Sequence, residues 1–220
     1  MKKVLITGAK GNIGSILSKS LKDDYHLTLV DLPKTDVRNY KSLLRIFPGH
    51  EAVIHLAWNA KTENFQGGFD PDNALMFSNV YRAALEAGVQ KVIMASSVHA
   101  DNFYPFVGKK RTLLSAEKIP EPSSPYGANK VFMEALGRFY ATQGLEVACI
   151  RFGAVGYGKP KDKLGKILWL SDDDCTSLIR KIIETKKIPG NFSVMYGVSN
   201  NKGRIHDFSN QFGWKPRDRI

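Results

Sequence analysis

The stretch "TGAKGNIG", Thr7 to Gly14, separates two runs of different periodicity. The preceding "KKVLITG" is apolar and β-branched, as in a buried strand, and the following "NIGSILSKSLKD" repeats apolar residues at helical spacing. Glycines at Gly8, Gly11 and Gly14 permit a tight turn, a close approach of the backbone to a pyrophosphate, and close packing of helix on strand. This pattern is typical of the first strand–helix unit of a dinucleotide-binding sheet.

The same alternation of strand-like and helical runs continues along the chain. Further strands are expected at 26–32, 51–58, 90–97, 145–152 and 191–198, and helices at 39–47, 71–88, from 124 onward, and 171–185. Strands that alternate with helices predict parallel βαβ units with right-handed crossovers. We therefore expect an α/β fold, a doubly wound parallel (Rossmann) sheet with a small C-terminal substrate-binding portion.

The composition limits the class of protein. At 220 residues, with 43% hydrophobic and 24% charged residues, the chain resembles an ordinary soluble globular domain. The net charge of +11 is spread along the chain without an aromatic-interleaved basic motif, so we expect anionic small ligands and no nucleic-acid partner. Apolar runs are too short to span a membrane, and the N-terminus has no cleavable apolar region. Cys149 and Cys175 lack metal or redox spacing, so we expect a cytoplasmic protein without a metal site.

Asp31 closes the second predicted strand, about twenty residues beyond the glycine loop. A carboxylate at this point can accept hydrogen bonds from the ribose hydroxyls of adenosine, and it repels a 2′-phosphate. The alternative is a surface aspartate that merely ends a strand. With the glycine motif before it, we favour NAD over NADP. The expected cofactor-binding residues of this region are Gly8, Gly11, Asn12, Ile13, Gly14 and Asp31.

We interpret residues 1–220 as a single NAD-binding domain. In such sheets, ligands bind beyond the carboxyl ends of the strands, and this sequence has long loops at that edge. We expect substrate loops at 98–123 and 152–170, and a C-terminal extension at 199–220.

A second informative stretch is "PSSPYGANK", Pro122 to Lys130. Ser124 can cap a helix and Pro125 suits the first helical position, so Tyr126 and Lys130 would share one helix face. On its own, this pair is more often a half-solvated contact than a catalytic group.

Taken together, the Gly-x-x-Gly-x-x-Gly spacing, the later "HLA" and the Tyr-x-x-x-Lys pair resemble the extended short-chain dehydrogenase/reductase superfamily, over nearly the whole chain. The resemblance implies that Ser97, in "MASSVH", forms the catalytic group with Tyr126 and Lys130. It also implies further cofactor-binding residues, namely Asp36, Val37, Leu56, Ala57, Asn79 and Ala95. From composition alone, Asp36 would be a turn residue and His55 a buried strand histidine.

The residue types suit the oxidation of an alcohol, in which a proton must be removed as a hydride leaves carbon. A free phenol has a pKa near 10 and is a weak base at neutral pH. A neighbouring ammonium and a positively charged nicotinamide stabilise the phenolate and bring its pKa toward the working range. We therefore expect Tyr126 to act as the base, Lys130 to hold the nicotinamide ribose, and Ser97 to bond the reacting oxygen.

Within the superfamily, the second half is most similar to uronate dehydrogenases, which oxidise a sugar acid at C1 to a lactone with NAD. The similar stretches are "ASSVH", "FYPF", "YGANKVFMEALGRFYA", "CIRFGA", "WLSDDD" and "VMYGVSNNKGRIHDFSN". There are departures: Val98 replaces the asparagine after the serine, and Ala154 replaces a substrate-binding serine. The arginine that grips the sugar carboxylate falls near Lys163 and Leu164, and lysine lacks its bidentate fork.

The expected substrate is a small sugar or sugar acid, contacted by Ser97, His99 and Lys163. A structural role for His99 is equally open. The long loop carries the aromatic residues Phe103, Tyr104 and Phe106 and the cations Lys109, Lys110 and Arg111, and the later loop adds Lys159, Lys161, Lys163 and Lys166. We hypothesise that some of these cations close over a carboxylate or phosphate; the alternative is a solvated loop pair.

Three other functions stay open at this point. A nucleotide-sugar epimerase or dehydratase would recycle its NAD, and a sugar-phosphate dehydrogenase would take a phosphorylated substrate. A non-catalytic NAD-sensing or RNA-associated protein has no need of Ser97, Tyr126 and Lys130. The resemblance also implies a homodimer, in which the helix carrying Tyr126 pairs with the helix carrying Asn79, or a higher homo-oligomer.

Overall fold

The computed structural model of the chain describes residues 1–60, 68–109 and 113–220. Its elements follow one another as β1 (Lys3–Thr7), α1 (Asn12–Ser20), β2 (His26–Val30), α2 (Tyr40–Ile46), β3 (Ala52–His55), α3 (Pro71–Glu86), β4 (Lys91–Ser97), η1 (Val98–Ala100), η2 (Tyr104–Phe106), α4 (Pro125–Thr142), β5 (Glu146–Phe152), α5 (Lys163–Leu168), α6 (Asp172–Glu184), η3 (Pro189–Asn191) and β6 (Phe192–Gly197). The expected α/β fold is confirmed.

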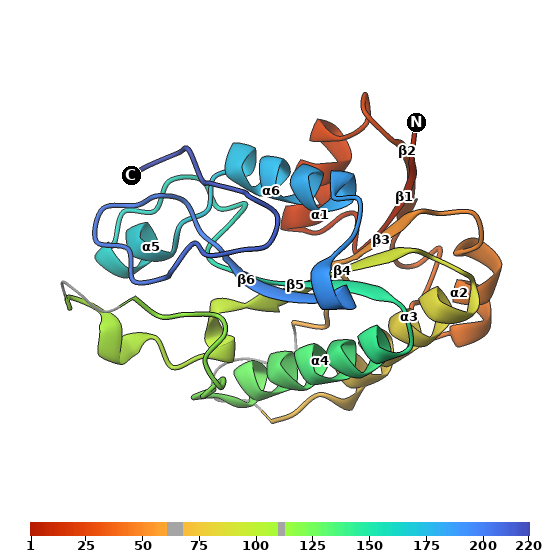
Figure 1. Cartoon of the computed structure of the whole chain (residues 1–220), viewed down its shortest axis with the longest axis horizontal. Coiled ribbons are helices and arrows are strands. Elements are labelled where there is room, and N and C mark those ends of the chain that lie inside the picture. The colour runs from red at the N-terminus through yellow and green to blue at the C-terminus, as the bar shows by residue number, and fades with distance from the viewer. Residues whose placement is uncertain (61–67, 110–112) are drawn as a thin grey trace.

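In the described residues, six parallel strands form one sheet in the order β2-β1-β3-β4-β5-β6. Helices cover both faces of this sheet, with α1 and α6 on one side and α2, α3 and α4 on the other (Figure 1). Two cores result, one between each helical layer and the sheet. Among the described residues, no helix has both the length and the apolar character of a membrane span.

Side chains of each strand alternate between these two cores. In β1, Val4 and Ile6 pack toward α1 and α6, while Leu5 packs toward α2 and α3. Because helices cover both faces, the strands are apolar on both sides, and this produces the continuous apolar runs of the sequence.

The chain adds strands to the sheet in two directions from β1, with β2 on one side and β3 to β6 on the other. This switch point determines where the ligand site lies. β1 pairs with β2 on one side and with β3 on the other, so that Thr7 is in register with both Val30 and His55. Ligands of open α/β sheets bind at such a switch point, beyond the carboxyl ends of the strands. The glycine loop after β1 and the segments after β3 and β4 meet at this edge.

One helix arises inside the predicted loop 152–170. α5 begins after Asp162, whose side chain accepts a hydrogen bond from the Gly165 amide at 2.7 Å. The stretch "KLGKIL" is too short and too rich in glycine and lysine to show a clear helical period. It is stabilised by tertiary packing, because Ile167 joins Phe103 and Ile205 in a third, smaller core.

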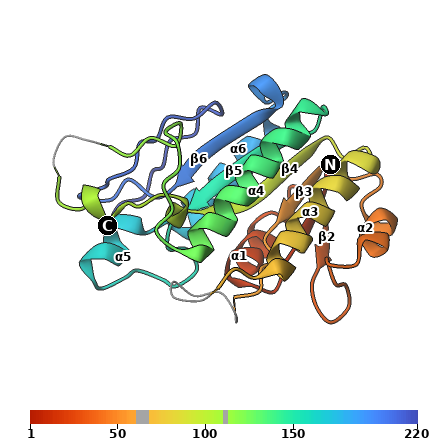
Figure 2. The ribbon, with the colours of Figure 1, turned by 90° about the horizontal axis from the view of Figure 1, so that it is seen from below.

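That small core holds together one end of the molecule. The loop after β4, α5 and the C-terminal segment lie together there in both views (Figures 1 and 2). A backbone bridge between Leu114 and His206 ties the loop to the C-terminal segment. These are the segments from which the sequence predicts substrate contacts.

Candidate active site

The glycine loop after β1 brings three chain segments unusually close together. Gly8 has φ of +69°, and a Cβ on it would lie 2.6 Å from the Ala57 nitrogen, beyond the end of β3. A Cβ on Gly14 would lie 2.2 Å from the Gly8 carbonyl oxygen, so α1 can approach the loop only with glycine at that position. Gly11 precedes α1 and offers no side chain to cap its first amides. Such an uncapped helix start is suited to a phosphate.

Two adjoining cavities lie along this edge of the sheet, and together they form what we call the cleft. The first, of about 510 Å³, is lined by Asp31, Asp36 and Val37 among others. The second, of about 270 Å³, is lined by residues from α1, β4, α4 and the segment after β5. Both cavities share the lining residues Gly8, Gly11, Leu56 and Trp58. A dinucleotide is the kind of extended ligand that suits such a pair of connected hollows.

Asp31 and Asp36 bring carboxylates to the first cavity. Asp31 accepts hydrogen bonds from the backbone amides of Lys10 and Leu32, each at 2.7 Å. Asp36 is paired with Arg38, whose hydrogen bonds to the carboxylate are the main reason that the pKa of Asp36 is lowered. Both carboxylates therefore lie at the end of the cleft where the sequence predicts the adenosine.

Asn79 has a different place from the other predicted cofactor residues. It lines neither cavity. Its side-chain amide donates hydrogen bonds to the carbonyl oxygens of Arg38, at 2.8 Å, and Val37, at 3.4 Å. Asn79 thus fixes the backbone that borders the first cavity. Ala57 lines the first cavity, whereas Asn12, Ile13, Gly14 and Ala95 line the second.

Ser97, Tyr126 and Lys130 line the second cavity together. Ser97 is the last residue of β4, and its hydroxyl accepts the amide of His99 at 3.2 Å. Ser124 caps α4 by accepting the Gly127 amide at 3.1 Å, and this places Tyr126 in the first turn and Lys130 one turn later.

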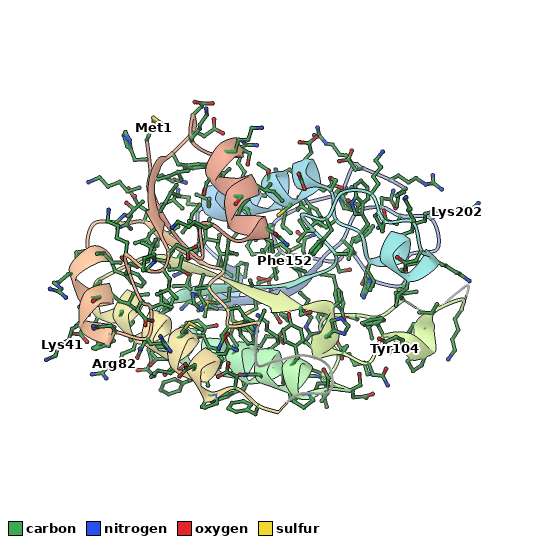
Figure 3. All side chains as sticks on the ribbon, turned by 180° about the vertical axis from the view of Figure 1, so that it is seen from behind. Met1, Lys41, Arg82, Tyr104, Phe152 and Lys202 are labelled. Atoms are coloured by element: carbon green, nitrogen blue, oxygen red, sulfur yellow. The ribbon has the colours of Figure 1, made fainter. Side chains whose placement is uncertain are left out.

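Close packing brings α4 to the end of β4. A Cβ on Gly127 would lie only 2.0 Å from the carbonyl oxygen of His99, so the first turn of α4 lies directly against the turn after Ser97. Lys130, which is 4% exposed, donates a hydrogen bond from Nζ to the Ala95 carbonyl oxygen at 2.7 Å. Phe152 lines the same cavity from β5 in the interior of the molecule, far from the exposed Tyr104 (Figure 3).

Trp58 lies in the cleft, although no sequence pattern indicated it. The indole lines both cavities, and Nζ of Lys130 lies 3.3 Å from its ring centroid. The Tyr126 ring meets it edge-on, with centroids 5.8 Å apart. An apolar residue at the end of a strand run looks like ordinary core in the sequence. The signal was its position directly after Leu56 and Ala57, which the resemblance had placed in the cleft.

The two residues expected to contact only the substrate differ in position. The His99 ring lies 6.0 Å from the Tyr126 ring, and burial lowers the pKa of His99 to about 4, so the imidazole is neutral at physiological pH. Lys163 begins α5, is exposed, and lines neither cavity. Lys109 lies with its Nζ 5.9 Å from the Phe106 ring centroid, and the predicted cations Lys110 and Arg111 fall outside the described residues.

A buried network of charges behind the second cavity was also missed. Arg151 of β5 forms two hydrogen bonds with the Glu134 carboxylate, at 2.9 and 2.7 Å, and a third with Asp101. Ser96, the neighbour of Ser97, donates to Glu134 at 2.5 Å, and Tyr196 donates to Asp101 at 2.7 Å. The network therefore connects β4, α4, β5 and β6. An arginine inside the apolar "EVACIRF" was the available signal, because a buried arginine needs partners.

Within the described ranges, no group of three or more histidine, cysteine, aspartate or glutamate side chains could hold a metal ion. The chemistry that the site offers is that of a phenol, an ammonium and a hydroxyl beside a dinucleotide-sized cleft.

Comparison with known proteins agrees with this geometry. The profile of the NAD dependent epimerase/dehydratase family matches residues 4–171. L-arabinose 1-dehydrogenase (NAD(P)(+)) of Haloferax volcanii is 31% identical, over 99% of this chain and 97% of its own length. NAD-dependent glucose-6-phosphate dehydrogenase of the same organism is 27% identical, over 98% of this chain and 93% of its own.

Solved structures of similar fold support the same family assignment. Uronate dehydrogenase from Agrobacterium tumefaciens superimposes with a TM-score of 0.85 at 27% identity, over 100% of this chain and 85% of that one. A mutant of that enzyme has been solved in complex with NAD. The chain therefore belongs to the NAD-dependent epimerase/dehydratase family, and within it to the NAD-dependent sugar dehydrogenases.

Proposed function

We propose that the protein oxidises a sugar or sugar acid at its C1 hemiacetal to a lactone, and that Ser97, Tyr126 and Lys130 carry the reaction. The observation that supports this most is that these three side chains line one cavity, which continues into the cavity bordered by Asp31. The relatives that act on arabinose, uronates and glucose 6-phosphate fit a sugar substrate.

Residues along the cleft suit NAD from end to end. Gly8 and Gly14 allow the loop, α1 and the segment after β3 to pack closely together, and the uncapped start of α1 offers backbone amides to the pyrophosphate. Asp31 would accept the ribose hydroxyls of the adenosine. Lys130 would hold the nicotinamide ribose. When bound, NAD supplies the acceptor for the hydride.

The chain's own groups handle the proton. As the C1–H bond breaks and its electron pair leaves as a hydride, the hydroxyl oxygen on C1 loses its proton to the Tyr126 phenolate, and the C1=O bond of the lactone forms. The Lys130 ammonium stabilises the phenolate by its charge. The Ser97 hydroxyl donates a hydrogen bond to the reacting oxygen, where negative charge develops.

The direct test is the formation of NADH with a panel of neutral aldoses, uronates and aldose phosphates. We expect net NADH with at least one sugar class, and a loss of about 100-fold or more in kcat for Tyr126→Phe, because a positioned general base contributes about that factor. Tyr140→Phe is the matched control, since Tyr140 lies near the C-terminal end of the same helix α4 and lines neither cavity. Full activity of Tyr126→Phe would remove the proposed base.

Adding nucleotide sugars to this panel separates the proposed activity from the nucleotide-sugar alternative. An epimerase or dehydratase returns its hydride to the sugar, so it converts a nucleotide sugar with retained NAD and no net NADH.

The acidic and neutral sugars of the panel also test the role of the lysines on the loops. If Lys109 and Lys163 bind an acidic sugar, replacing both with alanine raises KM for that sugar and leaves KM for a neutral aldose unchanged.

A further inference from the structure

We propose that Trp58 is a positioning residue for the oxidation, and that its aromatic face holds the Lys130 ammonium beside Tyr126. This inference rests on the proposed function for the role of Lys130 and Tyr126, and it assigns a purpose to a side chain that neither the glycine motif nor the Tyr–Lys pair involves.

The contacts of the ammonium define its position. Nζ of Lys130 lies 3.3 Å from the indole centroid of Trp58, and it donates a hydrogen bond to the carbonyl oxygen of Ala95 at 2.7 Å. One contact comes from the segment after β3 and the other from β4, so the ammonium is held from two neighbouring strands of the same sheet edge. The Tyr126 ring meets the indole at an interplanar angle of 87°. The indole thus touches both members of the proposed catalytic pair.

The physical reason for an aromatic residue here is the negative face of its π-system. A cation over such a face is attracted electrostatically, and the attraction is larger where water is excluded. Lys130 is only 4% exposed. Its flexible four-carbon stem has many rotamers, so a ring that attracts the ammonium selects those in which the charge lies beside Tyr126.

The polar atom of the indole supports the same assignment. Nε1 of Trp58 is enclosed, and it has no hydrogen-bond acceptor among the described residues. A buried donor without a partner is a cost to the folded protein. The contacts of Trp58 with Lys130 and Tyr126 both use the ring, so we expect phenylalanine to replace tryptophan and an aliphatic side chain not to.

Trp58 also borders both cavities, so a ligand that extends along the cleft must pass its ring. The chain has three tryptophans. Trp169 and Trp214 line neither cavity, and Trp214 donates its Nε1–H to Ser177 on α6. In a Trp169→Phe/Trp214→Phe background, the emission of Trp58 alone therefore reports on NAD binding.

The experiment compares Trp58→Phe with Trp58→Leu in the full-length protein. We expect Leu to weaken NAD binding severalfold and to lower kcat about tenfold, while Phe stays within about twofold of the parent in both. NAD titration of the Trp169→Phe/Trp214→Phe protein should change the emission of Trp58.

Equal behaviour of the Phe and Leu variants would overturn the proposal, and so would an emission that NAD leaves unchanged. Thermal unfolding of both variants shows whether a loss of NAD affinity or of kcat results from unfolding of the protein. The NAD titrations need no substrate. If no sugar of the panel is oxidised but Leu alone weakens NAD binding, the proposed reaction fails and the role of Trp58 at Lys130 stands.

Discussion

At the scale of single residues, burial keeps three histidines neutral. Loss of hydration lowers the pKa of His55 and His206 to about 3 and that of His99 to about 4, and the nearby charges of Lys130 and Arg151 add to the effect at His55 and His206. A histidine of the unfolded chain has a pKa near 6.5. Below that pH the unfolded chain binds protons that the folded protein does not accept. The stability that depends on these residues is therefore complete above about pH 6.5 and is lost as the pH falls toward 4 and 3.

His206 allows the cleanest test of this linkage. It is fully buried between the rings of Tyr196 and Phe103, and neither of its ring nitrogens has a partner among the described residues. We expect His206→Phe to fold. Between about pH 7 and about pH 5, its free energy of unfolding should fall by about 2 kcal/mol less than that of the parent. Urea titrations of the parent and of His206→Phe at the two pH values measure the fall in the free energy of unfolding of each. Equal falls in the two proteins would contradict the role of His206.

At the scale of elements, the Arg151 network joins the parts that carry the proposed catalytic residues. Glu134 lies one turn beyond Lys130 on α4, and Ser96 precedes Ser97 on β4, so one carboxylate links the helix to the strand. Arg151, at 1% exposure, compensates the charges of Glu134 and Asp101. Removing one partner of such a buried group leaves the others desolvated without a counter-charge.

For Arg151→Leu we expect a loss of about 3–5 kcal/mol in the free energy of unfolding. The matched control is Arg180→Leu, which breaks a surface ion pair with Asp24 and should cost at most about 1 kcal/mol. Urea denaturation of both variants gives the comparison. Similar losses in the two would show that the network contributes no more than a surface pair.

The elements themselves were largely predictable, and the reason is the regular period of buried strands and amphipathic helices. Gly8, Gly14 and Ser124 lie at a turn or a helix start that the neighbouring residues already indicate, so the sequence shows them directly. α5 was missed because its fold depends on Ile167 packing in the third core. Trp58 and Arg151 were missed because their roles depend on partners far away in the chain, which no local pattern contains.

At the scale of the whole molecule, α3 and α4 lie side by side and present a common outer face (Figure 2). Leu75 and Leu85 of α3 and Phe132 and Phe139 of α4 are large apolar side chains that are at least 37% exposed. A cluster of exposed apolar residues on one face is typical of an interaction surface. The homodimer that the sequence analysis predicts through these two helices would bury this face.

Sedimentation measures the oligomeric state and so tests that prediction. We expect the parent protein to be a dimer and the double variant Phe132→Glu/Phe139→Glu to be a monomer, because two charges would have to be desolvated at the interface. The control Tyr104→Glu places a charge on η2, outside α3 and α4, and should leave the dimer intact. A parent that sediments as a monomer would contradict the prediction.

The proposed reaction requires that the dinucleotide extend along the cleft and end beside Tyr126 and Lys130. A crystal structure of the protein with NAD tests it most directly. In that structure we expect the adenosine ribose on Asp31, the pyrophosphate at the start of α1, and the nicotinamide ring next to the Tyr126 hydroxyl. A nicotinamide ring far from Tyr126, or a cleft that stays empty at saturating NAD, would contradict it.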